Sequence, residues 1–221
     1  MASLPGITDF CTVKIVFITA TEMEMQALKP VSELHAIEEC ITGVGLLNTA
    51  IALQFLSTNR PDFLIQAGIG GSLSDSIQPG EVVAISKETI ADLGAEDGAQ
   101  FISVWESGLC SPDDFPYQQG WIENPHLSDF TLNIPIQQGL SVNAVAGSAK
   151  TVAWRKERYG EGVENMEGAA FHAMARLAEI PFLQIRGISN RVEVRDRSNW
   201  KIEEALQNTK QVVQHLIKTL V

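Results

Sequence analysis

The sequence predicts an α/β fold with three layers, in which helices cover both faces of a mixed, largely parallel central sheet. Three observations lead to this fold class. A chain of 221 residues with 45% hydrophobic content can bury one large core, and α/β chains of this length usually form one domain. Its short apolar, β-branched runs are typical of strands buried on both faces of a parallel sheet. These runs alternate with segments of helical periodicity, so we expect a single domain over residues 1–221.

The expected strands are short and apolar. The first, VKIVFITA over 13–20, is continuous and rich in β-branched residues. The others cover residues 34–42, 63–67, 81–86, the stretch GLSVNAVAG over 139–147, and 181–188. In a sheet of this kind the carboxyl ends of the parallel strands form the edge at which ligands bind.

The expected helices lie between these strands. Thr21 and Glu24 have the spacing of a capping box, and Pro30 limits the helix that they begin. Apolar residues at helical spacing predict further helices over 43–56, 149–159, 166–179 and 200–220. The helix over 166–179 is expected to bury one apolar side, made of Met166, Ala169, Ala170, Ala173, Met174 and Leu177. Between residues 99 and 135 no period is sustained, which predicts loops or lids.

Charge and cysteine content narrow the class of protein. The chain has 16 basic and 27 acidic residues, and a formal net charge of -11 would repel nucleic acid. Three cysteines (Cys11, Cys40 and Cys110) form no CxxC pair, which favours reduced thiols and no thiolate metal site. The first ten residues lack the pattern of a signal peptide, and no apolar stretch approaches the roughly 20 residues that span a bilayer. We expect a soluble cytoplasmic protein without a nucleic-acid or membrane partner.

Four features follow expected strand ends: a turn that includes Glu24, the glycine-rich segment 68–72, the segment 164–167, and Ser189 with Asn190. Taken alone, each has an ordinary structural interpretation. Glu24 is then a capping glutamate, the glycines permit a tight turn, and Asn190 is a turn residue. Their shared position at one edge of the sheet favours a site instead, because glycines also expose backbone amides to a ligand.

Neither a metal nor a cofactor is expected. The histidines at 35, 126, 172 and 215 lack metal-ligand spacing, and no GxGxxG or GxxxxGK[ST] follows the first strand. The glycines of GVG over 43–45 come too late for a dinucleotide fingerprint and lack its third glycine.

Five motifs, in order and spacing, resemble those of the nucleoside phosphorylase and nucleosidase superfamily. They are ITATEMEM (18–25), TGVGLLNTA (42–50), AGIGGSL (67–73), VENMEGAAF (163–171) and RGISN (186–190). The segments ADLGAED (91–97), VENMEGAA, and ISN followed by RDRSNW (195–200) are most similar to the futalosine hydrolase family. That family removes hypoxanthine from futalosine in a menaquinone pathway. The resemblance implies a nucleoside phosphorylase-like fold and an N-glycosidase that acts on a small purine nucleoside.

The resemblance also implies roles for individual residues. Glu24 corresponds to the acid that activates the attacking water, and Glu167 to the acid that holds the ribose hydroxyls. Met166, Gly70 and Gly71 lie in matching motifs and are expected substrate contacts. Relatives commonly form homodimers or larger assemblies in which a neighbour completes the pocket, so a homo-oligomer is expected here.

By the same resemblance, Asn190 corresponds to the position that recognises the base, where methylthioadenosine and adenosylhomocysteine nucleosidases carry an aspartate. An amide can donate to O6 or N7 of hypoxanthine, whereas an unprotonated carboxylate would set acceptor against acceptor. A 6-oxopurine is therefore favoured. Cleavage at C1′ would pass through an oxocarbenium-like state. Glu167 would favour its positive charge, Asn190 would stabilise the departing purine, and Glu24 would deprotonate the attacking water.

Three alternatives stay open. Phosphorolysis needs a phosphate site, but the turn over 21–26 has no arginine and position 69 is isoleucine, so hydrolysis is favoured. An adenosylhomocysteine-type nucleosidase is disfavoured by Asn190. A nucleoside-binding or storage relative without turnover is disfavoured by the presence of both Glu24 and Glu167.

Three arginines beyond Asn190 are candidates to bind the carboxylate of futalosine. They are Arg191, Arg195 and Arg197. Arginines in a polar loop are more often solvated, so the alternative is that they bind nothing.

Overall fold

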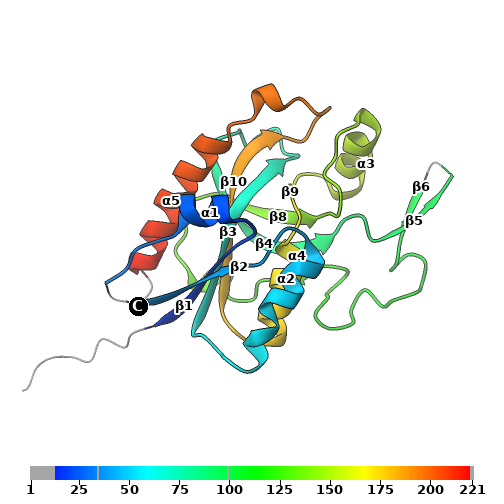
Figure 1. Ribbon diagram of the computed structural model, residues 1–221. Helices are drawn as coiled ribbons and strands as arrows, with labels where there is room; N and C mark the ends of the chain where they lie inside the picture. Colours follow the sequence, from blue (N-terminus) through cyan, green and yellow to red (C-terminus); the bar gives the residue numbers. More distant parts are fainter. Residues whose placement is uncertain (1–12, 34, 99, 220–221) are drawn as a thin grey trace, which may run out of the picture.

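A computed structural model describes residues 13–33, 35–98 and 100–219. Within them, one sheet of eight strands runs in the order β10-β4-β8-β9-β3-β1-β2, with β7 beside β4 (Figure 1). Its strands are β1 (Lys14–Thr19), β2 (Ala36–Ile41), β3 (Phe63–Ser72), β4 (Val82–Ile90), β7 (Ile122–Glu123), β8 (Ile136–Ser141), β9 (Val163–Asn165) and β10 (Phe182–Arg191). A separate hairpin consists of β5 (Gly94–Asp97) and β6 (Gln100–Ser103), and it extends away from the body of the molecule.

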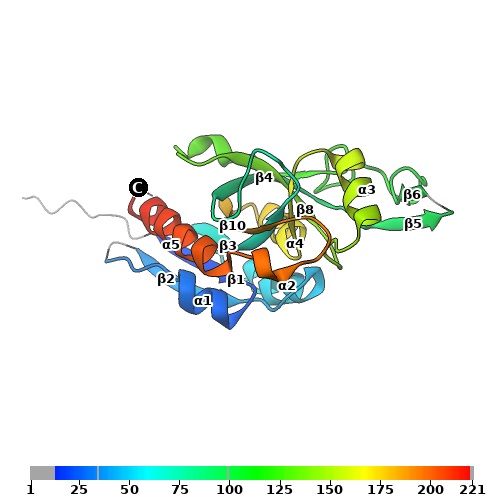
Figure 2. The same ribbon diagram turned by 90° about the horizontal axis from the view of Figure 1, so that it is seen from above.

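The helices are α1 (Glu22–Leu28), α2 (Leu46–Ala52), α3 (Ala149–Tyr159), α4 (Gly168–Leu177) and α5 (Ile202–Thr219). Short 3₁₀ turns cover Leu53–Ser57, Leu127–Asp129 and Arg197–Asn199. Helices α1 and α5 lie on one face of the sheet, and α2 and α4 lie on the other (Figures 1 and 2). This arrangement confirms the expected α/β fold with helices on both faces.

The sheet is mixed and largely parallel, as expected. Parallel pairings join β1 to β2 and β3, β3 to β10, and β8 to β4 and β9. The pairings β10–β4, β3–β9 and β4–β7 are antiparallel. Because β3 pairs with both β10 and β9, the strands β3, β10, β4, β8 and β9 form a closed circuit. Part of the sheet therefore curls on itself, which the alternation of apolar segments did not predict.

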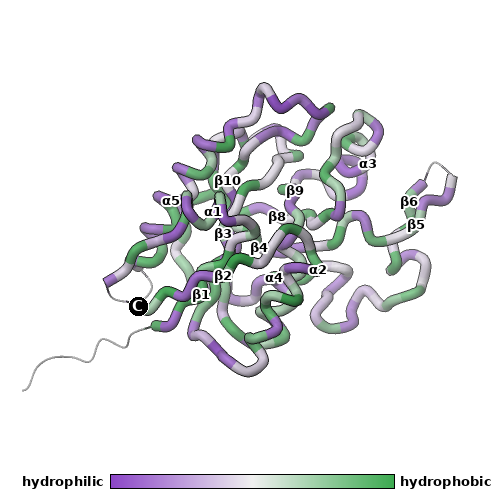
Figure 3. Tube along the Cα trace, in the orientation of Figure 1, coloured by the Kyte–Doolittle hydropathy of each residue, from purple (hydrophilic) through white to green (hydrophobic). Residues whose placement is uncertain are grey.

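Strand β1 shows why a continuous apolar run predicts burial on both faces. Ile15 and Phe17 pack into the cluster that includes side chains of α1 and α5, whereas Val16 and Ile18 pack against α4 and the 3₁₀ turn after α2. All four side chains are fully buried. Hydrophobic colour accordingly marks the central strands, while hydrophilic and hydrophobic segments alternate along α5 (Figure 3).

The glycine-rich segment 68–72 does not form the predicted turn. It continues β3 as far as Ser72 and pairs with β10 on one side and β9 on the other. A Cβ atom at Gly70 would lie 2.6 Å from Cγ1 of Val163, so glycine is needed for β9 to cross so closely. Ser189 and Asn190 likewise belong to strand β10, which shifts register between Ile188 and Asn190. Glycine and asparagine are common in turns, but here sheet pairing overrides that preference.

The predicted buried side of the fourth helix is rotated. The buried residues of α4 are Gly168, Ala169, Phe171, His172 and Ala175, whereas Leu177 is 59% exposed. Only Ala169 of the predicted set is fully in the core, and Met166 precedes the helix. The helix begins later than predicted because Asn165 Oδ1 accepts hydrogen bonds from the backbone N–H groups of Glu167 and Gly168. That contact places Met166 outside the helical repeat.

Other boundaries differ in smaller ways. The helix predicted over 43–56 is divided into α2 and a 3₁₀ turn, and β4 continues to Ile90. Strand β8 ends at Ser141, so residues 142–147 form a loop instead of the predicted strand. Helix α3 has the predicted bounds, and residues 100–135 are mostly irregular, while residue 99 lies outside the described residues. Leu34, Leu220, Cys11 and the first ten residues lie outside the described residues. In the described part of the chain, no helix is long and apolar enough to cross a membrane.

Candidate active site

A pocket of about 290 Å³ opens where the parallel strands β1, β3 and β10 end. It is lined by residues of α1, the loop before α2, the ends of β3 and β10, the segment 164–167, and two loops around 145 and 195–200. Eight of the nine predicted site residues line it: Glu24, Gly70, Gly71, Met166, Glu167, Asn190, Arg195 and Arg197. The four features that follow predicted strand ends thus lie around one cavity.

Glu24 is both a capping residue and a pocket residue. Its Oε2 accepts hydrogen bonds from the backbone N–H of Thr21 (3.1 Å) and from Thr21 Oγ1 (2.8 Å), and Thr21 Oγ1 accepts from Glu24 N–H in return. Its Oε1 accepts from the backbone N–H of Ile69 (3.1 Å). The side chain is only 4% exposed. These three donors hold the carboxylate still at the pocket wall, as a general base requires.

Glu167 faces the pocket with two different partners. Its Oε1 accepts from the backbone N–H of Gly45 (3.1 Å), and Arg186 Nη1 lies 3.5 Å from its Oε2. Gly45 has φ +97°, which a side-chain residue rarely adopts, so glycine is suited to present its N–H there. Both charged groups are almost completely buried. Because a buried charge is costly without a partner, Arg186 compensates Glu167 in this position.

Arg186 has several further partners around the pocket. Besides Glu167, its guanidinium donates to the Ile69 carbonyl, to Gln66 Oε1 and to Asn165 Oδ1. A Cβ atom at Gly68 would lie 2.8 Å from Glu24 Oε1 and 2.9 Å from Arg186 Nη1. Glycine at this position therefore provides the room in which the Glu24 carboxylate and the guanidinium approach each other.

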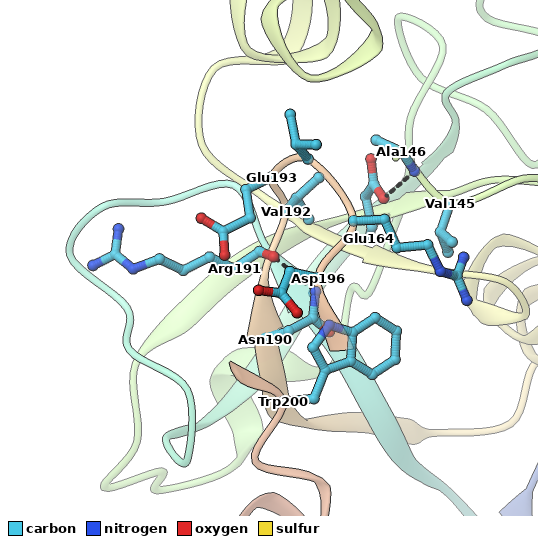
Figure 4. Close-up of a pocket in the computed structure, with 12 residues that line it drawn as sticks. Val145, Ala146, Glu164, Asn190, Arg191, Val192, Glu193, Asp196 and Trp200 are labelled. Carbon is cyan, nitrogen blue, oxygen red and sulfur yellow. Dashed lines mark hydrogen bonds between the residues drawn. The ribbon is translucent and has the colours of Figure 1, made fainter. Parts of the chain in front are cut away.

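Asn190 lines both the pocket and a smaller cavity of about 50 Å³, whose lining residues are drawn in Figure 4. Its Oδ1 accepts from Ser189 Oγ (2.8 Å), and its Nδ2 donates to the Arg191 carbonyl (2.8 Å). The amide packs over Gly71, where a Cβ atom would lie 3.3 Å from Nδ2. The side chain is only partly buried, so one hydrogen of Nδ2 and one lone pair of Oδ1 remain available for a ligand.

The three predicted arginines have different surroundings. The guanidinium groups of Arg195 and Arg197 lie 5.7 and 5.4 Å from the ring centre of Trp200, and all three residues line the pocket. Arg191 points away from Trp200 (Figure 4). Its guanidinium donates to Asp75 Oδ1 (3.2 Å) and Gln78 Oε1 (2.8 Å), so it borders only the smaller cavity. Arg191 therefore does not line the larger pocket, although it shares the smaller cavity with Gly71, Asn190 and Arg195.

Sequence reasoning missed several residues that shape the pocket. Arg186 is in the RGISN motif and interrupts an apolar strand, a signal of a buried charge that was not used. Glu164 pairs with buried Arg155 of α3 and accepts from the backbone N–H of Ala146, which fixes the loop at the pocket wall (Figure 4). Trp200 carried no sequence signal beyond its place in RDRSNW. In residues 13–33, 35–98 and 100–219, no three His, Cys, Asp or Glu side chains cluster as a metal site would require.

The chain belongs to the phosphorylase superfamily, whose family model matches residues 33–221. A futalosine hydrolase of Thermus thermophilus is 27% identical over 180 residues, which are 80% of this chain and 79% of that protein. A futalosine hydrolase of Streptomyces coelicolor is 33% identical over 151 residues, which are 66% of this chain and 62% of that protein.

Solved structures share the fold. Futalosine hydrolase of Helicobacter pylori aligns with a TM-score of 0.74 at 13% identity, over 95% of this chain and 99% of that one. A methylthioadenosine nucleosidase of the same organism, with 5'-methylthioadenosine in its active site, aligns with a TM-score of 0.76 at 13% identity, over 94% and 99% of the two chains. The predicted nucleoside phosphorylase-like fold is confirmed.

Proposed function

We propose that this protein hydrolyses the N-glycosidic bond of futalosine and releases hypoxanthine. The observation that carries the proposal is the convergence of Glu24, Glu167 and Asn190 on one pocket. The similarity to proteins named futalosine hydrolase supports the choice of substrate. Hydrolysis of a purine nucleoside needs three groups that these residues supply. They are a general base that deprotonates water, a carboxylate that binds the ribose hydroxyls, and an amide that hydrogen-bonds a 6-oxopurine.

The proposed mechanism assigns one step to each residue. Glu24, held by three donors, orients a water molecule and removes its proton as it attacks C1′. Glu167 binds the ribose hydroxyls and favours the positive charge that develops on the sugar. Asn190 donates to the purine as negative charge gathers on it. Met166, Gly70 and Gly71 form the wall against which the nucleoside packs.

A direct assay tests this function. Purified protein is incubated with futalosine, inosine and methylthioadenosine, each with and without phosphate, and free base is measured. Release of hypoxanthine from futalosine without phosphate is the expected result. Ribose 1-phosphate formation would identify a phosphorylase instead, and no base from any substrate would favour a nucleoside-binding protein. Preferred cleavage of methylthioadenosine would indicate a nucleosidase like the relative from Maridesulfovibrio salexigens, which is 26% identical over 199 residues.

Replacing Asn190 with aspartate should change base preference. The variant loses the N–H donor that faces O6 or N7, so its kcat/KM for futalosine should fall by about 10- to 100-fold, the range of one or two charged hydrogen bonds. The ratio of cleavage of methylthioadenosine to futalosine should rise. Because both substrates are measured on one variant, the ratio is its own control for folding. An unchanged ratio would show that Asn190 does not select the base.

Replacing Arg195 or Arg197 with alanine should weaken binding of the futalosine carboxylate. We expect the KM for futalosine to rise by up to about tenfold, because a charge-assisted hydrogen bond at an exposed site is lost. The KM for inosine, which lacks the carboxylate, should stay the same. Arg191→Ala is the matched control, since Asp75 and Gln78 already occupy that guanidinium. If neither Arg195 nor Arg197 affects the KM for futalosine, another group binds the carboxylate.

We further propose a cytoplasmic homo-oligomer. Supporting this, Leu47 and Ile51 are 72% and 56% exposed on one side of α2, and Met23 and Val44 beside the pocket are also exposed. Exposed apolar side chains that gather in this way are typical of interfaces. Light scattering measures the mass in solution, and a monomer at micromolar concentration would contradict the proposal.

A further inference from the structure

Glu88 of β4 lies in a sealed niche behind the pocket and does not line it. Its side chain is 0% exposed. Two glycines make room for it: a Cβ atom at Gly139 would lie 2.1 Å from Glu88 Oε1, and one at Gly168 would lie 1.9 Å from the same oxygen. The Glu88 carboxyl group therefore fits only because positions 139 and 168 are glycines, and a side chain at either position would exclude it.

Three side chains hydrogen-bond to this carboxyl group. Asn165 Nδ2 donates to Oε1 (2.7 Å), Gln184 Nε2 lies 2.8 Å from Oε1, and Ser141 Oγ donates to Oε2 (3.0 Å). No lysine or arginine is among these direct partners. Burial dominates, and it raises the pKa of Glu88 from its usual 4.5 to about 7.

Two buried polar atoms around Gln184 lack hydrogen-bond partners. His172 Nδ1 lies 3.0 Å from the Ile122 carbonyl and must donate to it, so His172 Nε2 is an acceptor. Nε2 of His172 and Oε1 of Gln184 are both buried without a partner. Two acceptors cannot satisfy each other. The oxygen and nitrogen of an amide are assigned from their partners, so the reversed orientation of Gln184 has to be considered.

Reversing the Gln184 amide satisfies both orphan atoms if Glu88 carries a proton. The side chains of His172 and Gln184 lie within hydrogen-bonding range, so the amide nitrogen then donates to His172 Nε2, and the amide oxygen accepts from the Glu88 hydroxyl. If Glu88 were ionised, its carboxylate and the Gln184 amide oxygen would be two acceptors facing each other without a hydrogen between them. A single proton on Glu88 thus completes the hydrogen bonds of Glu88, Gln184 and His172.

The same niche is connected to Glu167. Asn165, held by Glu88 and Ser141, uses its Oδ1 to accept from the backbone N–H of Glu167 (3.1 Å) and of Gly168 (2.6 Å), and from Arg186 Nη2 (3.3 Å). Asn165 therefore fixes both the backbone of Glu167 and the cation that pairs with its carboxylate. Without Glu88, the Asn165 amide would lose the acceptor that sets its orientation.

We propose that Glu88 is a neutral carboxylic acid and a positioning residue, which holds Glu167 in place through Asn165. The positioning role rests on the proposed function of Glu167, whereas the protonation does not. Among the described residues, Arg186 of β10 is the charged group that acts directly on Glu88. His172 of α4 and Glu167 are linked to Glu88 through Gln184 and Asn165, and β7 brings Glu123 opposite the neighbouring Lys87. Burial lowers the pKa of His172 to about 3, so His172 stays neutral at working pH.

Protonation is tested without any substrate. At pH 6 exposed carboxyl groups, with pKa values of about 4, are ionised, so a C=O stretching band of a carboxylic acid reports a buried one. We expect this infrared band in the wild-type protein, its loss as the pH rises through about 7, and its absence in Glu88→Gln. A wild-type protein without the band at pH 6, or with the same band in Glu88→Gln, would overturn the protonation.

The pH dependence of Tm is an independent measure of whether Glu88 is protonated. Between about pH 4.5 and 7 the unfolded chain loses the Glu88 proton while the folded protein keeps it, so Glu88 stabilises the fold less as the pH rises. Glutamine does not titrate. The Tm of Glu88→Gln relative to wild type should therefore rise across this range and level off above it. The contribution of His172 is common to both proteins and cancels in the difference.

Positioning is tested by comparing Glu88→Leu with Glu88→Gln. Leucine fills the niche but cannot accept from Asn165, so turnover should fall by about 100-fold, the effect expected of a displaced catalytic group. Glutamine keeps a carbonyl oxygen that accepts from Asn165, so it should restore most of the turnover. Above pH 7 an ionised Glu88 would compete with Glu167 for the charge of Arg186, so wild-type kcat/KM should decline there, whereas Glu88→Gln should lack this decline.

The possible outcomes are separable. Circular dichroism shows whether Glu88→Leu is folded, and if it is not, the pH profiles of wild type and Glu88→Gln still decide. Equal turnover in folded Glu88→Leu and wild type, or the same decline above pH 7 in wild type and Glu88→Gln, would overturn the positioning role. If the wild-type protein cleaves no nucleoside, the proposed function fails, and the infrared and melting results still decide the protonation of Glu88.

Discussion

Replacing Glu24 with glutamine is expected to reduce hypoxanthine release by about 100- to 10,000-fold, the range that general-base catalysis supplies. The amide cannot take the proton of the attacking water. It also meets donors on both sides, since Oε2 of Glu24 accepts from Thr21 and Oε1 accepts from the Ile69 N–H. One of those hydrogen bonds must be lost, which costs about 1 kcal/mol of stability, as at other helix caps.

The matched control for this variant is Glu22→Gln. Glu22 is in the same first turn of α1 but is exposed, and its carboxylate hydrogen-bonds the side chain of Gln26. Turnover of the control should equal that of wild type. The measurement is initial rate of base release at saturating futalosine, with a thermal melt of both variants. If Glu24→Gln turns over as fast as Glu22→Gln, Glu24 is not the base.

Replacing Arg186 with methionine is expected to destabilise the fold by about 3–5 kcal/mol. Arg186 is 2% exposed and is paired with Glu167, which is itself almost fully buried. Removing the cation leaves a buried carboxylate without its counter-charge, and it also leaves Gln66 Oε1 without its donor. For a chain of this length such a loss lowers Tm by about 6–20 °C.

A double variant isolates the charge effect. In Arg186→Met with Glu167→Gln, neither member of this buried pair carries a charge, so part of the lost stability should return. Lys201→Met removes a cation from an exposed pair with Glu204 and should change stability by less than about 1 kcal/mol. Chemical denaturation measures all four proteins. An Arg186→Met protein as stable as wild type would contradict the role of Arg186 in compensating Glu167.

Local sequence patterns predicted elements whose burial and hydrogen bonds are local. The apolar run of β1, the capping box of Thr21 and Glu24, and the whole of α3 are as expected. Motifs likewise identified most of the residues that line the pocket. The secondary structure that local patterns did not predict depended on partners distant in sequence. Gly68 to Ser72 can form a turn or a strand with equal ease, and pairing with β9 and β10 makes it a strand.

The residues of the site also divide into those that local sequence identified and those that it did not. Glu24 and Glu167 were found because they lie in motifs beside helix starts, whereas Arg186 and Glu88 lie within strands, where no local rule distinguishes a functional charge from a structural one. Arg191, Arg195 and Arg197 are equivalent in sequence. Asp75 and Gln78, which are more than 100 residues away, separate Arg191 from the other two.

By itself the sequence determined the α/β class, the superfamily and the identity of the glutamates and the amide that the proposed chemistry uses. Only the tertiary structure decided that the sheet closes on itself, which arginine meets Glu167, and that Glu88 lies behind them. The physical reason is that propensity and periodicity act over a few residues along the chain, whereas buried charges and polar atoms are satisfied by whatever the fold brings beside them.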